Sequence, residues 1–395
     1  MHRDPSTPLV AVNVLYDVGA RDEDKEKTGF AHLFEHLMFE GSVNIKDFDS
    51  QLQTAGGESN AFTNNDITCY FETLPAINLD TALWLESDRM LDIGITQEKL
   101  DIQKRVVIEE FKEGYLNQPY GDSWHLISAL SFKEHPYQWP TIGLVPKHIE
   151  DATLEDVQSF YKEHYQPSNA ILCIAGGIEI EETKKKVEKW FGEIPFFPKP
   201  KRSVKEEPKQ TEKRVQTVER DVPQDALYMA FHIPGRRDYD YIVSDLLTDI
   251  LSNSDSSRLE RKLVKEKSIF SELDAFVLGS YDPGLLIIEG KLHEGVSTEQ
   301  GEQEVWSILN DLKTGTVSKE ELERIRNKAA TQKEFSEVNI FHRSLNLSVY
   351  ELLSNAEDIN DEIEKYLSVS SEDLKRVANT IFDENNSNVL HYKKS

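Results

Sequence analysis

Three ionisable residues, His32, Glu35 and His36, interrupt a run from Phe30 to Phe39 that is otherwise apolar. At spacings of three and four residues they share one face of a helix. Two histidines one turn apart can hold a single Zn²⁺, and a carboxylate beside them can act as a general base toward water. A helix that is otherwise apolar is expected to be buried, where ionisable groups need partners or a metal. The residues alone leave open a core helix whose His and Glu side chains bond to one another.

A third metal ligand is expected, because catalytic zinc sites usually combine three protein ligands with one open position. The helical segment 97–114 offers Glu109 and Glu110. Glu109 has charged helical neighbours, whereas Glu110 has mainly apolar ones, so we expect Glu110 to lie on a drier face and to bind the metal. Periodicity alone leaves open that both are ordinary surface glutamates.

The elements that must position these residues follow from apolar periodicity and from turn residues. The motif helix is expected over residues 28–40, with Thr28 as its N-cap. The patterns predict further helices and strands in both halves of the chain: helices at 76–92, 97–114, 154–164, 239–253, 299–314 and 318–354, and strands at 9–16, 68–74, 170–175, 225–233 and 285–292.

The chain divides into two similar halves. The segment beginning at Leu154 resembles the segment beginning at Ser371, and each leads through a Ser-Asn pair into a short apolar strand. Residues 196–214 are rich in Pro, Lys and Glu and read as an exposed linker. We therefore predict two homologous α+β domains, 1–195 and 215–395, of which only the first carries the His-Glu-His motif.

Composition excludes several classes of partner. The formal net charge of −26 argues against binding to nucleic acid or to anionic membrane surfaces. No apolar run approaches the length of a membrane span, and no signal peptide is visible, so a cytoplasmic protein is expected unless the N-terminus has been trimmed. The two cysteines, Cys69 and Cys173, lie in separate strand-like runs and are expected to be buried free thiols.

Several ordered motifs together resemble the pitrilysin family of zinc peptidases, which includes insulin-degrading enzyme and the mitochondrial processing peptidase. The resemblance covers nearly the whole chain. It rests on the inverted zinc motif His32–His36, the run from Gly57 to Thr63, the run from Val106 to Glu110, the segment His135–Tyr137 with Gly143, the run from Tyr165 to Ala170, and the segment Ser256–Leu259. The fold it implies has two homologous domains of the processing-peptidase type, each a mostly antiparallel sheet packed with helices.

The resemblance implies one Zn²⁺ per chain bound by His32, His36 and Glu110, with Glu35 as general base, although Mn²⁺ or Co²⁺ could occupy such a site. It also implies that a peptide or an unfolded polypeptide binds in extended form along a sheet edge. The residues expected to form that edge are Asn60, Ala61, Phe62 and Thr63. An ordinary sheet edge is the alternative reading of this segment.

Three features depart from the family pattern. A Glu usually stands seven residues before the ligand Glu, where this chain has Gln103; its amide oxygen can still orient a ligand histidine. Active members carry an Arg and a Tyr that help to stabilise the oxyanion, and the aligned positions hold Val264 and Ser271. Family members also normally have an additional strand before the segment that begins at Pro5.

These features predict a zinc metalloendopeptidase subunit that works with a second family subunit. A heterodimer whose partner carries the Arg and Tyr is favoured, and a homodimer is the other possibility. Two further readings are a non-catalytic scaffold and a subunit that holds zinc and binds peptides with little turnover.

Overall fold

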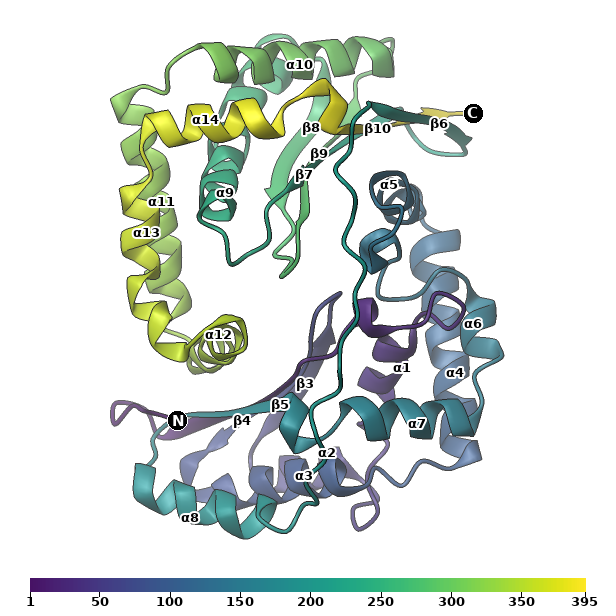
Figure 1. Cartoon of the computed structure of the whole chain (residues 1–395), viewed down its shortest axis with the longest axis vertical. Helices are drawn as coiled ribbons and strands as arrows, with labels where there is room; N and C mark the ends of the chain where they lie inside the picture. Colours follow the sequence, from purple (N-terminus) through teal and green to yellow (C-terminus); the bar gives the residue numbers. More distant parts are fainter. The chain divides into compact units, whose positions relative to one another are not determined.

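The computed structural model describes residues 1–395, which form two compact units. Unit 1 comprises residues 1–112, 139–204 and 334–360, and unit 2 comprises residues 113–138, 205–333 and 361–395. Each unit contains one five-stranded sheet packed with helices (Figure 1). The α+β architecture with two similar sheets is therefore confirmed.

The sheet of unit 1 has the strand order β1-β5-β2-β4-β3. Its short strand β1 pairs with β5 in parallel, and the other neighbours are antiparallel. The strands are β1 (His2–Arg3), β2 (Leu9–Tyr16), β3 (Glu58–Thr63), β4 (Thr68–Pro75) and β5 (Ala170–Gly176), and the helices are α1 (Phe30–Leu37), α2 (Phe48–Thr54), α3 (Leu79–Leu91), α4 (Gln97–Phe111), α6 (Pro146–Glu150), α7 (Leu154–His164), α8 (Ile180–Phe191) and α12 (Ile340–Leu353).

The sheet of unit 2 repeats this topology in the order β6-β10-β7-β9-β8, again with one parallel pair at an edge. Here the parallel edge strand is seven residues long, whereas β1 has two. The strands are β6 (Arg214–Arg220), β7 (Ala226–Ile233), β8 (Phe270–Val277), β9 (Gly284–Leu292) and β10 (Ser387–Lys394), and the helices are α5 (Ser123–Ser131), α9 (Tyr239–Leu251), α10 (Thr298–Thr314), α11 (Lys319–Ser336), α13 (Glu362–Ser368) and α14 (Ser371–Ile381).

The two units exchange one helix each. Helix α5 comes from the first half of the chain and packs on strands β6, β7 and β10 of unit 2. Helix α12 comes from the second half and packs on β2 and β5 of unit 1 (Figure 1). Phe341 of α12 stacks on Phe71 of β4, with ring centroids 3.7 Å apart. The boundaries of the two compact units therefore differ from those of the predicted domains 1–195 and 215–395. Residues 196–214 do connect the two halves of the chain.

Two predicted helices differ from the structure. The expected helix 318–354 is two helices, α11 and α12, and Asn339 caps the second by accepting the Phe341 amide at 2.8 Å. The motif helix α1 is shorter than 28–40, and its N-cap is Gly29 with φ of 91°. Thr28 was therefore the wrong cap; its hydroxyl accepts the Leu144 amide instead.

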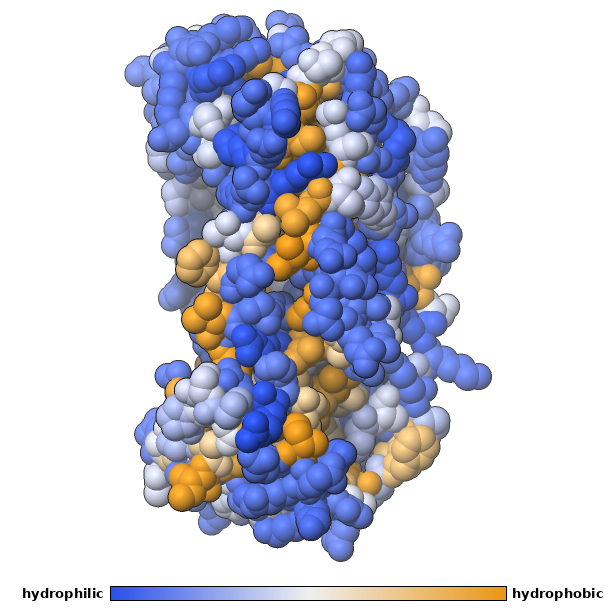
Figure 2. Space-filling view, turned by 90° about the vertical axis from the view of Figure 1, so that its left-hand side faces the viewer, coloured by the Kyte–Doolittle hydropathy of each residue, from blue (hydrophilic) through white to orange (hydrophobic).

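Both cysteines are free and buried, as expected. None of the helices is long and apolar enough to span a lipid bilayer. The face drawn in Figure 2 is mainly hydrophilic, and its apolar side chains form separate patches.

Candidate metal site

Helix α1 is anchored by its apolar side. Phe34 is fully buried and stacks against Tyr165 and Phe160, with ring centroids 4.9 and 5.3 Å apart. The Tyr70 hydroxyl of β4 donates a 3.0 Å hydrogen bond to the Phe34 carbonyl. These contacts tie the helix to the sheet and to α7, so its direction is set by the core of unit 1.

Glu23 holds the beginning of α1, a role that the sequence analysis missed. Its buried carboxylate accepts the amides of Gly29 and Ala31 at 2.9 and 2.8 Å. Burial raises the pKa of Glu23 to about 8 even though these amides favour the charged form. Because Glu23 lies outside the helix and seven residues before its start, no helical or capping pattern in the sequence identifies it.

The polar side of α1 is only partly covered. The side chains of His32, Glu35 and His36 keep 19%, 21% and 21% of their surface exposed, so the stripe is open to solvent rather than buried as expected. The two imidazole rings lie 4.9 Å apart between centroids. A stripe that is partly exposed can both hold a ligand and admit a substrate.

Glu110 on the neighbouring helix α4 completes a three-residue group. Its Oε2 lies 3.1 Å from Nε2 of His32 and 3.3 Å from Nε2 of His36. Glu110 does lie on the drier of the two faces, as expected, but it is not buried, because its side chain is 44% exposed. Glu109 is 64% exposed and pairs with Lys112 at 2.6 Å on the outer side of the helix.

The three ligand atoms fit a tetrahedral metal ion. All lie within 4.8 Å of one another. Ligands bound to Zn²⁺ at about 2.0–2.1 Å and at tetrahedral angles lie about 3.3 Å apart, close to the two distances from Glu110. Two imidazoles and one carboxylate form a donor set that zinc accepts, with a fourth position left for water. The group is therefore a candidate metal site.

Charges within the group act on one another. Burial lowers the pKa of His32, but hydrogen bonds with Glu35 and Glu110 outweigh it and raise the pKa. Burial and the charge of His32 lower the pKa of His36. Burial raises the pKa of Glu35, but hydrogen bonds from His32 and Thr63 and the nearby imidazole charges outweigh that effect and lower it. The arrangement favours an ionised carboxylate beside the imidazoles.

The segment Asn60–Thr63 lies in β3, the edge strand of the sheet, which pairs only with β4. Strand β3 contacts α1, and the Thr63 side chain lies close enough to Glu35 to favour its ionised form. Asn60 is exposed, and its side-chain oxygen accepts the Ala61 amide at 2.8 Å. An edge strand beside the polar stripe leaves backbone groups free to pair with an added strand.

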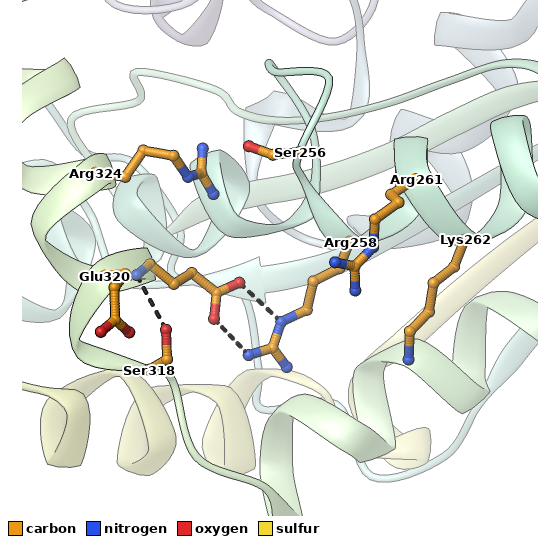
Figure 3. Close-up of a pocket in the computed structure, with 8 residues that line it drawn as sticks. Ser256, Arg258, Arg261, Lys262, Ser318, Glu320 and Arg324 are labelled. Atoms are coloured by element: carbon orange, nitrogen blue, oxygen red, sulfur yellow. Dashed lines mark hydrogen bonds and ion pairs between the residues drawn. The ribbon is translucent and has the colours of Figure 1, made fainter.

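Two other cavities lack a comparable group of metal-binding side chains. One in unit 1, of about 490 Å³, is lined largely by apolar side chains between the end of α3 and α7. The other, in unit 2 and of about 400 Å³, is lined by Arg258, Arg261, Lys262 and Arg324 (Figure 3).

Carboxylate and hydroxyl oxygens accept hydrogen bonds from basic side chains of this second cavity. Arg258 is paired with both oxygens of Glu321 at 3.0 and 2.8 Å, and Lys262 with Asp311 at 3.0 Å. Arg324 donates to the Ser254 hydroxyl at 2.8 Å. Because its cations already have partners, this cavity offers no competing candidate.

Comparison with known proteins places both halves of the chain in one family. Residues 1–130 match the description insulinase (peptidase family M16), and residues 151–329 match peptidase M16 inactive domain. The zinc protease PqqE of Helicobacter pylori is 28% identical over 98% of this chain and 88% of that protein. The crystal structure of a protease from Helicobacter pylori superposes with a TM-score of 0.93, 28% identity, and coverage of 98% of this chain and 94% of that one.

A eukaryotic relative is named as one subunit of an assembly. The probable mitochondrial-processing peptidase subunit beta of Arabidopsis thaliana is 25% identical over 63% of this chain and 47% of that protein. The similarity thus extends to proteins in which the same kind of chain is one part of a larger enzyme.

Proposed function

Because the chain belongs to the M16 (insulinase) family of peptidases, we propose that it is the metal-binding subunit of a zinc metalloendopeptidase that cleaves peptides in extended form. The observation that carries this proposal is that His32 and His36 of α1 meet Glu110 of α4, while Glu35 lies on the same face of α1 as the two histidines. A scaffold would have no need for this combination of groups.

In this proposal His32, His36 and Glu110 hold one Zn²⁺. When bound, the ion acts as a Lewis acid toward water and the scissile carbonyl. Glu35 takes the proton from the attacking water at a carboxylate oxygen and later delivers it to the leaving amine nitrogen. Thr63 orients Glu35 through its hydroxyl, so the edge strand and the base are held in one geometry.

Strand β3 binds the substrate in this proposal. An extended peptide adds to its free edge through main-chain hydrogen bonds, with Asn60 and Ala61 presenting polar groups along that edge. Binding through the main chain selects for unstructured segments rather than for one side chain. Peptides or unfolded polypeptides are therefore the substrate class.

The oxyanion is stabilised by a second family subunit. At the aligned positions, Val264 packs against the core of unit 2, and the Ser271 hydroxyl donates to the Lys291 carbonyl at 3.2 Å. Neither side chain offers the cationic or phenolic donor that an Arg and a Tyr would bring. We therefore favour a heterodimer whose partner carries that pair, in line with a relative that is named as one subunit of an enzyme.

The alternative is a subunit that holds zinc and binds peptides without efficient turnover. Gln103, Val264 and Ser271 all favour it, because each replaces a residue that the catalytic pattern uses. A metal-free scaffold is a further alternative, and it predicts no zinc at all.

Metal analysis of the purified chain, with kinetics, tests the proposal. One zinc per chain and cleavage of an unstructured fluorogenic peptide are expected when the Arg- and Tyr-bearing partner is present. The variant Glu35→Gln keeps the zinc and loses about 10²- to 10⁴-fold in kcat, as expected for a lost general base. The absence of zinc would support the scaffold, and equal, near-zero rates for both proteins with every family partner tried would support the peptide binder.

A further inference from the structure

Glu40 and Gln103 form a hydrogen-bonded pair directly behind the metal group. Glu40 lies four residues after His36, in a bend beyond the end of α1, and Gln103 precedes Glu110 by two turns on α4. Nε2 of Gln103 donates to Oε1 of Glu40, and both residues are half-buried. No Lys, Arg or His pairs with the Glu40 carboxylate, so the amide is its principal side-chain partner.

This pair determines how the Gln103 amide is turned. A carboxylate can only accept hydrogen bonds, so the NH₂ group of the amide must face Glu40. Its carbonyl oxygen therefore points the other way. That oxygen, Oε1 of Gln103, is buried and has no hydrogen-bond partner in the structure. A buried acceptor without a donor is costly, which implies that a donor completes it in the working protein.

A candidate donor is the imidazole of His36. The Gln103 side chain lies within reach of that ring. Nε2 of His36 faces Glu110, which leaves Nδ1 on the opposite side of the ring. An Nδ1–H group donating to Oε1 of Gln103 leaves the Nε2 lone pair directed at the ligand group. A ligand histidine commonly donates its other ring N–H in this way.

We propose that Glu40 is a positioning residue for the metal site, acting through Gln103 on the tautomer and orientation of His36. The negative charge of Glu40 polarises the neutral Gln103 amide, which in turn accepts from His36. A carboxylate at position 103 would instead contact His36 directly. This inference rests on the proposed metal site. It names a residue outside the ligand set that contributes to metal affinity.

Zinc affinity of the full-length chain, measured by competition with a chromophoric chelator, tests the proposal. Glu40→Gln should weaken zinc binding about tenfold, because second-layer partners of ligands typically contribute 10- to 100-fold. The matched control is Glu109→Gln, which removes the same charge from the exposed side of α4 and should change affinity less than twofold.

A second background makes the test specific. In the Gln103→Glu variant two carboxylates face each other, so adding Glu40→Gln should strengthen zinc binding rather than weaken it. This reversal of sign is not expected from general destabilisation, and circular dichroism checks that each variant is folded. If Glu40→Gln weakens binding equally in both backgrounds, or no more than Glu109→Gln, the proposal is overturned.

A readout in the metal-free protein separates this inference from the proposed function. Glu110 faces Nε2 of His36 and by itself favours the Nε2–H tautomer in the metal-free protein. In the wild type, ¹⁵N NMR should nevertheless show a substantial population of the Nδ1–H tautomer, and Glu40→Gln should reduce that population. If the wild type binds no zinc, the proposed function fails while the tautomer measurement still decides the role of Glu40. If the wild type binds zinc and the tautomer is unchanged in Glu40→Gln, the role of Glu40 fails alone.

Discussion

Each unit brings histidine and glutamate side chains together, but in one unit they form a buried ion pair and in the other a partly exposed candidate metal site. In unit 2, Glu302 lies 3.4 Å from Nε2 of His391, and the two side chains are only 11% and 6% exposed. Lys213 and the Trp306 ring N–H also donate to that carboxylate. In unit 1, two imidazoles and Glu110 face one another with no Lys or Arg among them and remain partly exposed. A carboxylate with a cation beside it is a structural pair, and one without leaves room for a metal ion.

The helices that follow the central strand of each sheet differ in the same way. In unit 1 this helix is α1, and the side chains of its polar stripe are about one-fifth exposed. In unit 2 it is α9, which follows β7 and buries Val243, Leu246, Leu247 and Ile250. Both helices keep a partly exposed face: on α9 it carries Asp240 and Asp249, which pair with Arg376 and Lys328, whereas on α1 it carries the His-Glu-His stripe. The chemistry depends on which residues the uncovered face carries.

Removing a ligand should have the largest effect in this comparison. His36→Ala takes away one of three donors and should weaken zinc binding at least 100-fold, because protein ligands together contribute about 10–16 kcal/mol in zinc-binding peptides. Chelator competition measures the change. The control is His342→Ala, an exposed histidine of α12 that should leave affinity unchanged. Equal affinities of the two variants would contradict the ligand assignment.

Truncation of the two packed helices should cost similar amounts. Phe34 in α1 and Leu247 in α9 are both fully buried. Phe34→Ala and Leu247→Ala should each lower the free energy of unfolding by about 3 kcal/mol or more through lost transfer energy and a residual cavity. Denaturant unfolding of each variant tests this. A loss below about 1 kcal/mol for Phe34→Ala would mean that the open helix is not anchored by its apolar side.

The Glu302 cluster should make unit 2 sensitive to acid. Burial raises the pKa of Glu302, but bonds from His391 and Lys213 outweigh it and lower the pKa to about 2. A depressed folded-state pKa gives stability that is present above the unfolded value, about 4.5, and lost as the pH falls toward 2. The Glu302→Gln variant should lack about 2 kcal/mol of this pH-dependent stability. Unfolding measured at intervals between pH 6 and pH 2.5 checks the slope, which should be unchanged if the cluster contributes nothing.

The smallest effect concerns the repeated capping boxes. Thr153 caps α7 and Ser370 caps α14, each with an Asp that reaches back to the cap. Thr153→Ala and Ser370→Ala should each cost about 1 kcal/mol, because the amide that the hydroxyl satisfied is left without it. Thermal unfolding compares them with the wild type. A large cost in one unit and none in the other would show that the two helices are not equivalent.

Much of the architecture follows from local patterns. Strand β2 and helix α7 begin and end at the predicted residues, because alternation and helical spacing depend on neighbours in the chain. The repeat around Leu154 and Ser371 corresponds to equivalent helices α7 and α14 with the same capping. Edge strands β6 and β8 were not predicted, since β6 is largely polar, β8 does not alternate regularly between apolar and polar residues, and both depend on the sheet for pairing.

The ligand group illustrates both sides of the problem. Spacing within one helix brings His32 and His36 together, so the sequence suffices for that pair. Glu110 lies 74 residues beyond His36. Helical periodicity placed it correctly on a drier face than Glu109, but it gave no sign that this partly exposed carboxylate meets both imidazoles. The roles of Glu23 and Glu40 also depend on contacts with distant backbone or side chains, which no local spacing describes.

By itself, the sequence determined the helical stripe of His32, Glu35 and His36, the repeat of two α+β halves and the acidic character of the chain, because these depend on residue type and near-neighbour spacing. Folding in three dimensions decided which face of α1 stays open, brought Glu110 within 3.3 Å of both imidazoles and exchanged α5 and α12 between the units. These outcomes depend on packing between segments far apart in the chain, where burial and shape complementarity, rather than local propensity, select the arrangement.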